Sequence, residues 1–273
     1  MADWFAGDIH ANGIKIHYTR TGGSKPPLVL CHGATDNGLC WTPVALALED
    51  NYDVIMPDSR WHGLSDGPVD GNAPDSQVED LFGFLHALDL KKPVLMGHSM
   101  GASTVFQAAS RYPDLARAII LEDPPFREPV QKENTGQAQP FIGRMRQSLL
   151  EYKTMSPATL VELIHKQAPS WSEEELGPWA DSKLQVSLNF VEMMGNRPMP
   201  AFPWEDLPKI ICQVLLITAD PDKGAIITPE IAQKAARMLP LLTFVRIPGA
   251  GHNIRREAFG PYMVAVKEFL TRV

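Results

Sequence analysis

A serine lies between two glycines in the stretch VLMGHSMGAS, residues 94–103, where an apolar run ends. A serine hydroxyl is a weak nucleophile and attacks a carbonyl group only when a neighbouring base takes its proton. The motif Gly-x-Ser-x-Gly serves this chemistry when it follows a strand and begins a helix, because the sharp turn exposes the serine. Residues 92–97 resemble a strand and residues 102–113 a helix. The context predicts Ser99 as a nucleophile, and the plainer alternative is a helix N-cap.

The base that a nucleophilic serine needs is best supplied by histidine, whose imidazole exchanges a proton near neutral pH. The chain has eight histidines. His252 lies in a glycine-rich loop, IPGAGHN, that follows a late strand. Because the carboxyl ends of parallel strands meet at one edge of a sheet, we predict His252 and Ser99 at the same edge. The other candidates lie on the predicted hairpin, on helices or in loops, and we do not expect any of them to be the base. They are His10, His17, His62, His86, His98 and His165.

The elements that would position these residues alternate between strand and helix. A tight turn at Asn12-Gly13 predicts an N-terminal antiparallel hairpin. Further strands are expected near residues 26–33, 52–58, 92–97, 116–124, 211–220 and 242–248. Helices are expected near residues 41–49, 75–90, 102–113, 228–239 and 257–272. This alternation predicts an α/β fold with a mostly parallel sheet flanked by helices.

Residues 125–208 interrupt the alternation, since they contain helical segments and prolines but no convincing strand. At roughly 80 residues this insertion is large for a loop. Its large apolar side chains would either form a core of their own or face Ser99 and line an apolar pocket. They are Phe126, Phe141, Met145, Trp171, Trp179, Phe190, Met193, Met194, Phe202 and Trp204.

Four motifs, in the order LCHGATDN, DSRWHGLSD, VLMGHSMGAS and IPGAGHNIRRE, resemble those of the α/β-hydrolase superfamily. The resemblance covers about residues 8–124 and 209–273. It implies an α/β-hydrolase catalytic domain formed by residues 1–124 and 209–273, with a helical cap at residues 125–208.

The resemblance assigns roles to the matching positions. Ser99 corresponds to the nucleophile and His252 to the base. The pair His32-Gly33 corresponds to the loop that follows the third strand. In that superfamily, backbone N–H groups beside this pair and after the nucleophile stabilise the oxyanion. Here these are the N–H groups of Ala34 and Met100.

The acid that orients the histidine is ambiguous in this sequence. The superfamily usually carries the acid after the strand that resumes the fold beyond the cap. Counted from the position where most members have Gly, which is Ala219 here, the acid falls on Asp222. A minority of members carries it one strand earlier, where this chain has Asp123 before two prolines. We take Asp222 as the leading assignment and Asp123 as the alternative. Asp220 and Glu122 are further candidates.

These assignments predict a serine hydrolase that cleaves a carboxylic ester or lactone of a fairly apolar small molecule through an acyl-enzyme. The same fold also supports carbon–carbon bond hydrolysis, perhydrolysis and thioester cleavage, or a ligand sensor with slow turnover. The motif cannot separate these activities, because fold analogy alone does not name a substrate.

Composition limits the partners. The net charge is −7 and the chain has no run of Lys or Arg, so we expect neither nucleic acid nor a membrane as a partner. We see no secretory signal, and no apolar stretch approaches the length of about 18 residues that a membrane helix needs. Three cysteines without a C-x-x-C pair suggest reduced thiols and a cytoplasmic protein. No metal-ligand spacing or phosphate-binding loop is present, so no cofactor is expected. The oligomeric state stays open.

Overall fold

Eight strands of the computed structural model form one sheet in the order β1-β2-β4-β3-β5-β6-β7-β8. The structure describes residues 4–67, 76–126, 138–195 and 203–273. The strands are β1 (Phe5–Ala11), β2 (Ile14–Arg20), β3 (Pro27–Cys31), β4 (Asp53–Pro57), β5 (Val94–His98), β6 (Ala118–Glu122), β7 (Gln213–Thr218) and β8 (Leu242–Arg246). β1 pairs with β2, and β2 with β4, in antiparallel fashion, whereas all other neighbours are parallel. The predicted mostly parallel sheet is confirmed.

The N-terminal hairpin turns where the sequence predicts it. Asn12 has φ 47° and Gly13 has φ 78°. A two-residue turn with both φ values positive is favoured by an Asn-Gly pair, which adopts this region at low cost. The turn fixes a register in which Ala11 pairs with Ile14.

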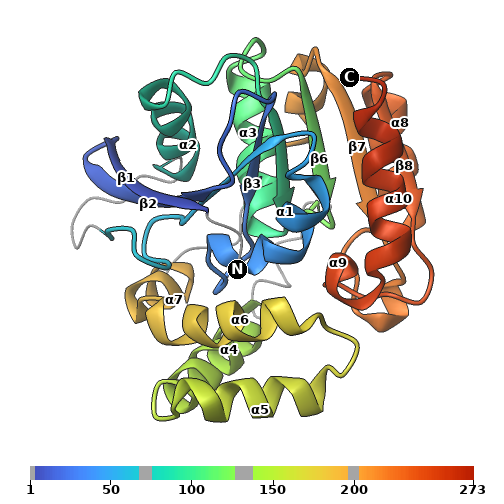
Figure 1. Ribbon diagram of the computed structural model, residues 1–273. Coiled ribbons are helices and arrows are strands. Elements are labelled where there is room, and N and C mark those ends of the chain that lie inside the picture. The colour runs from blue at the N-terminus through green and yellow to red at the C-terminus, as the bar shows by residue number, and fades with distance from the viewer. Residues whose placement is uncertain (1–3, 68–75, 127–137, 196–202) are drawn as a thin grey trace.

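Helices cover both faces of the sheet (Figure 1). Alternate residues of a strand point to opposite faces. Thus Leu95 of β5 belongs to the core under α2, α3 and α8, while Val94 and Met96 belong to the core under α1 and α10. These helices are α1 (Thr42–Leu48), α2 (Ser76–Ala87), α3 (Met100–Arg111), α8 (Pro229–Met238) and α10 (Phe259–Leu270). Burial on both faces explains the near-continuous apolar sequence of the central strands.

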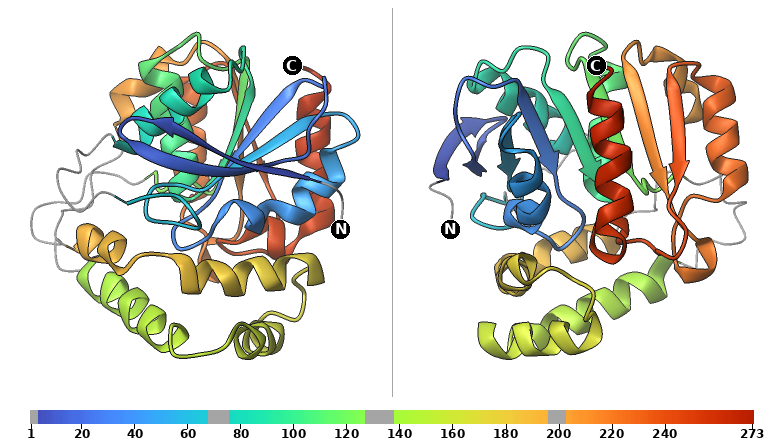
Figure 2. Two further views of the ribbon diagram at one scale, coloured as in Figure 1. Left: turned by 60° about the vertical axis from the view of Figure 1, so that its left-hand side comes forward. Right: turned by 45° about the vertical axis from the view of Figure 1, so that its right-hand side comes forward.

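Four helices form a separate layer beyond the carboxyl ends of the parallel strands (Figures 1 and 2). We call this group the helical layer; it consists of α4 (Ala138–Tyr152), α5 (Pro157–Gln167), α6 (Glu173–Gln185) and α7 (Leu188–Gly195). Within it, α5 and α6 share a small core that includes Leu160, Ile164 and Trp179. Like the other described helices, those of the layer are too short or too polar to cross a membrane.

Short helices shape the loops between these elements. They are η1 (Gly38–Trp41), η3 (Trp204–Lys209), η4 (Pro221–Lys223) and α9 (Ile254–Glu257). η1 follows the loop after β3, η4 follows β7, and α9 begins two residues after His252. All three therefore lie next to the edge of the sheet at which Ser99 was expected.

Candidate active site

Ser99 occupies a strained turn between β5 and α3. Its φ of 51° and ψ of −113° lie in a region that residues other than glycine rarely adopt. The flanking glycines are required by close packing, since a Cβ atom on Gly97 would lie 2.4 Å from the backbone carbon of Gly101. A Cβ atom on Gly101 would lie 2.1 Å from the carbonyl oxygen of Cys31. Strain of this kind persists only where the surrounding structure enforces it, and here it leaves Ser99 half-buried at the end of the strand.

His252 connects Ser99 to a carboxylate. Its Nε2 atom lies 3.0 Å from Ser99 Oγ, and its Nδ1 atom lies 2.6 Å from Asp123 Oδ2. Because the carboxylate accepts the Nδ1 proton, Nε2 is left free to accept the proton of the serine hydroxyl. The predicted proximity of Ser99 and His252 is therefore present in the structure. The imidazole is partly exposed, whereas Asp123 is fully buried.

Asp123 is held by the loop that follows β7. Its carboxylate accepts the backbone N–H groups of Ile226 at 2.8 Å and of Ile227 at 3.0 Å. Asp123 itself has φ 41°, and its N–H donates to the carbonyl oxygen of Ile217. These contacts fix the carboxylate in one orientation beside the imidazole.

The leading prediction for the acid, Asp222, is wrong as to which residue meets His252. Asp222 lies in η4 and is exposed, and the bond from His252 Nδ1 goes to Asp123. The loop after β7 supplies backbone N–H groups to Asp123 and no carboxylate to His252. Asp220 is engaged elsewhere, with Arg246 and the N–H of Gly249. Glu122 faces Arg255.

The two backbone donors named for the oxyanion lie beside Ser99. Met100 is the first residue of α3, so its N–H has no partner within the helix. A Cβ atom on Gly33 would lie 3.6 Å from Ser99 Cβ. The loop that carries the Ala34 N–H therefore runs past the serine. The Ala34 and Met100 side chains also pack against one common apolar cluster.

Comparison with known proteins places this fold and site in a family. A model described as "Alpha/beta hydrolase family" matches residues 28–259. The chain belongs to this family. The expected superfamily and fold are thus confirmed.

Three similar proteins are a hydrolase, a deformylase and an esterase by name. The chain is 25% identical over 261 residues to a 2-(acetamidomethylene)succinate hydrolase of Mesorhizobium japonicum, covering 92% of this chain and 90% of that protein. It is 26% identical over 273 residues to an N-formylmaleamate deformylase of Pseudomonas putida, covering 97% and 96%. A thermophilic esterase structure from Thermogutta terrifontis superimposes with a TM-score of 0.71 at 25% identity, covering 98% of each chain. The protein is accordingly a hydrolase of the α/β family.

Three buried histidines brace the loops of this α/β hydrolase. His32 Nε2 accepts the N–H of Ser59 at 2.9 Å, and His62 Nε2 accepts the N–H of Thr35 at 3.3 Å. His98 is paired through Nε2 with the carbonyl oxygen of His252 at 3.0 Å, so it supports the loop that carries His252. Each of the first two rings has a nitrogen acting as an acceptor and is therefore neutral. Burial lowers the pKa of His62 to about 3 and lowers the pKa of His32 and His98 as well.

These histidines predict loss of stability in mild acid. The pKa of His62 is depressed from 6.5 in the unfolded chain to about 3 in the fold, so the unfolded state binds the proton first. The contribution of neutral His62 to the free energy of unfolding is fully present above its unfolded-state pKa of 6.5. It declines as the pH falls from 6.5 toward the folded-state pKa of about 3. At about 1.4 kcal/mol per pH unit, His62 alone should cost about 2 kcal/mol by pH 5.

Urea unfolding at pH 8, 6.5 and 5 measures this effect. We expect equal free energies of unfolding at the first two values, within about 1 kcal/mol, and a marked fall at pH 5. The His62→Gln variant should show a shallower dependence on pH. A free energy of unfolding that stays constant from pH 8 to pH 5 would contradict the assignment of neutral buried histidines.

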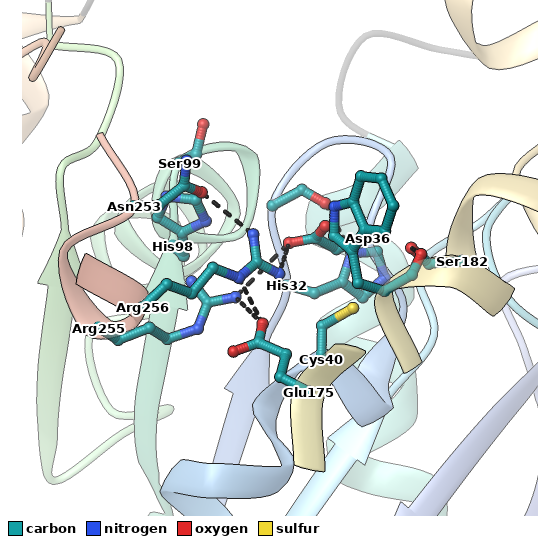
Figure 3. A network of polar contacts seen from close by, with 12 residues as sticks. His32, Asp36, Cys40, His98, Ser99, Glu175, Ser182, Asn253, Arg255 and Arg256 are labelled. Atoms are coloured by element: carbon teal, nitrogen blue, oxygen red, sulfur yellow. Dashed lines mark hydrogen bonds and ion pairs between the residues drawn. The ribbon is translucent and has the colours of Figure 1, made fainter. Parts of the chain in front are cut away.

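A group of buried charges connects the helical layer to the loops that follow β3 and His252. We call it the ion-pair cluster; its members are Asp36, Glu122, Glu175, Lys183, Arg255 and Arg256, all buried. Arg256 contacts Asp36 at 3.0 Å, Asn253 at 3.1 Å and Glu175 (Figure 3). Lys183 of α6 lies 3.0 Å from Asp36. Three cations thus meet three carboxylates, which limits the cost of burying the charges.

Electrostatics within the ion-pair cluster favour ionised Asp36. Burial alone raises the pKa of its carboxyl, but Arg256, Lys183 and Arg255 together hold it well below the usual range. The sequence contains one signal of this cluster, the pair Arg255-Arg256 just after the loop of His252. The periodicity of the sequence could not reveal the ion-pair cluster, since the partners of these arginines lie in the loop before η1, on β6 and on α6. Among the described residues, no group of three or more His, Cys, Asp or Glu side chains is arranged to hold a metal ion.

Apolar side chains of the helical layer pack against residues next to Ser99. Phe190 of α7 and Ile142 of α4 pack in one cluster with Trp61, and Ala34 and Met100 border it. We call this the apolar cluster. Because Ala34 and Met100 flank the serine, a group bound to Ser99 would adjoin these side chains.

The apolar residues singled out in the insertion divide between several environments. Those that join the apolar cluster are Phe190, Met145, Met193 and Met194. Trp171 and Trp179 pack inside the helical layer, whereas Phe126 and Trp204 pack under the sheet. Phe141 is exposed. Phe202 lies outside the described residues.

Proposed function

We propose that the protein is a serine hydrolase that cleaves a carboxylic ester or lactone of a fairly apolar small molecule. The observation that carries this proposal is the hydrogen-bonded series from Ser99 Oγ through His252 to Asp123, with distances of 3.0 and 2.6 Å. Ser99 is the nucleophile, His252 the general base and Asp123 the acid. The three unpaired cysteines support a cytoplasmic location.

The reaction proceeds in two halves. Ser99 Oγ attacks the substrate carbonyl carbon while His252 Nε2 takes the hydroxyl proton. His252 then returns this proton to the leaving oxygen, and the acyl group stays on Ser99. Water, deprotonated by the same nitrogen, attacks the acyl carbon; the bond to Ser99 Oγ breaks, His252 returns the proton to Oγ, and the carboxylic acid product leaves. Throughout, Asp123 keeps the imidazole in one tautomer and stabilises its charged form.

The developing oxyanion is stabilised by the N–H groups of Ala34 and Met100. Removal of one such donor typically costs about 3 kcal/mol of transition-state stabilisation. The strained turn at Ser99 supports this role, because it places the serine next to the Met100 N–H, which has no partner within α3.

The apolar cluster supports the proposal that the substrate carries an apolar acyl group or lactone ring. We propose that the helical layer acts as a cap and presents Phe190 and its neighbours to the substrate. Arg255, Arg256 and Lys183, the cations of the ion-pair cluster, are engaged by carboxylates of the protein. They are therefore poorly suited to bind a second carboxylate from a substrate.

A second candidate is hydrolysis of an amide-type bond in a small organic acid. The names of two relatives favour it, and each alignment covers at least 90% of both chains. The same triad and oxyanion donors serve amide and ester carbonyls alike. The two candidates differ in the polarity of the group that must be bound.

Turnover of a substrate panel tests the proposal. The panel comprises p-nitrophenyl acetate, butyrate and octanoate, a lactone series, N-formylmaleamate and 2-(acetamidomethylene)succinate. We expect turnover of the esters or lactones with kcat/KM rising with acyl length, and no turnover by Ser99→Ala. Turnover confined to the two organic acids would favour the second candidate, and turnover of none would contradict both.

Truncation of Phe190 tests the apolar cluster as a substrate contact. Phe190→Ala should lower kcat/KM for the octanoate ester about tenfold more than for the acetate, since only the longer chain loses apolar contact. Phe141→Ala, an exposed phenylalanine of α4, is the matched control and should leave the ratio unchanged. An unchanged ratio in Phe190→Ala would show that the cluster does not contact the acyl chain.

A further inference from the structure

We propose that Glu122 is a positioning residue of the active site, and that its side chain fixes the loop of His252 against the turn of Asp123. This inference rests on the proposed roles of Ser99, His252 and Asp123. It concerns a residue that touches none of the reacting atoms and acts through its neighbours.

Glu122 contacts the segments that carry all three of these residues. Its carbonyl oxygen accepts the N–H of Ser99 at 3.0 Å. It directly precedes Asp123 in the chain. Its Oε1 atom accepts the N–H of Arg255, three residues after His252, at 2.9 Å. The side-chain contact is the one among these that depends on the residue being glutamate.

The place of Glu122 in the sheet makes a carboxylate unexpected. Ile120, two residues earlier on β6, packs in the core under α1 and α10, and Glu122 points to the same face. Glu122 is fully buried. A buried carboxylate is strongly unfavourable unless it is paired. An apolar side chain would fill this position at lower cost, so the glutamate is explained by what it binds.

The contact between Glu122 and the N–H of Arg255 holds the loop of His252 at one point. His98 holds the same loop at a second point, through the carbonyl oxygen of His252 at 3.0 Å. Glu122 Oε2 also lies 3.4 Å from the guanidinium Nη1 of Arg255, which stacks on Trp41. The imidazole is thereby kept in place between Ser99 and Asp123. Misplacement of a catalytic group by about 1 Å can cost about 100-fold in rate.

Two conservative variants separate reach from charge. Glu122→Asp keeps the charge but shortens the side chain, so it withdraws the acceptor from the N–H of Arg255. Glu122→Gln keeps the length and one acceptor oxygen but removes the charge. If Glu122 acts by positioning, Glu122→Asp should lose about tenfold or more in kcat, with KM within about twofold. Glu122→Gln should stay within about threefold of the wild type in both constants.

A matched control addresses general destabilisation. Asp53 is a buried carboxylate paired with Arg20 at the amino end of β4, which is the opposite edge of the sheet. Asp53→Asn should leave kcat per folded molecule unchanged, with folding measured by circular dichroism and urea unfolding. Ser99→Ala is assayed in the same series.

The outcomes distinguish this inference from the proposed function. Three results would each overturn the positioning role. They are a wild-type kcat in Glu122→Asp, equal losses of kcat in Glu122→Asp and Glu122→Gln, and a loss of kcat in Asp53→Asn equal to that in Glu122→Asp. In these cases an inactive Ser99→Ala leaves the proposed function standing. Full activity in Ser99→Ala would overturn the proposed function and this inference with it. The expected result is a tenfold or larger loss of kcat in Glu122→Asp alone among the two glutamate variants and the control.

Discussion

Asp123→Asn should lower kcat by about 10⁴-fold, the loss typical when the acid of such a triad is neutralised. The amide nearly matches the carboxylate in size, but it cannot stabilise the charged imidazole. It also favours the wrong tautomer of His252, because its NH₂ group would donate to Nδ1. Steady-state kinetics on the best ester of the panel measures this loss. Urea unfolding must accompany the assay, since Asp123 also accepts N–H groups from Ile226 and Ile227.

The matched variant is Asp222→Asn. Asp222 is exposed in η4, so the kcat of the Asp222→Asn variant should stay within about twofold of the wild type. A severe loss in Asp222→Asn together with a mild one in Asp123→Asn would mean that the loop after β7 rearranges when substrate binds. The contacts of Asp123 described above would then not represent the catalytic state.

Ser99→Ala should lower kcat by at least about 10⁴-fold while the fold remains intact. The Ser99 hydroxyl contacts His252 Nε2, and its removal takes away the nucleophile of the proposed acyl-enzyme. Alanine is smaller, and Ser99 is only half-buried, so its loss should change stability little. Retention of more than about a tenth of wild-type turnover would contradict the nucleophilic role.

The double variant Ser99→Ala/His252→Ala adds a test of joint action. Nucleophile and base serve one step, so their losses should not multiply. We expect the double variant to fall within about threefold of either single variant. Multiplicative losses would assign the two residues to separate steps.

The sequence carries most of the information on the fold. Apolar strands alternating with helices predict the parallel sheet, and the Asn-Gly pair predicts the hairpin, because both depend on local patterns. Ser99 and His252 could be brought together for a similar reason: each follows a strand, and parallel strands present their carboxyl ends at one edge.

The acid could not be chosen in this way. β6 and β7 are neighbours in the sheet, so Asp123 and Asp222 both follow strands that end at the same edge. The choice depends on the path of the loop after β7. This loop turns Asp222 outward in η4 and directs the N–H groups of Ile226 and Ile227 at Asp123. Such a path depends on tertiary contacts and has no local signature.

The ion-pair cluster was beyond prediction for a related reason. Asp36, Glu175 and Arg256 are far apart in the chain and meet only when the helical layer has packed on the sheet. The apolar residues of the insertion show the same limit. Phe190 and Phe126 are both large apolar residues of the insertion, yet one packs in the apolar cluster beside Met100 and the other packs under the sheet.

Covalent labelling with a p-nitrophenyl alkylphosphonate tests the central claim most directly. A nucleophilic serine next to a competent base displaces p-nitrophenol from such a reagent and keeps the phosphonyl group. We predict one phosphonyl group per chain, located on Ser99 by peptide mass spectrometry, with activity lost in proportion to labelling. Ser99→Ala and Asp123→Asn should react slowly or not at all, while Asp222→Asn should react at the wild-type rate. Inactivation with the label on a residue other than Ser99 would contradict the account.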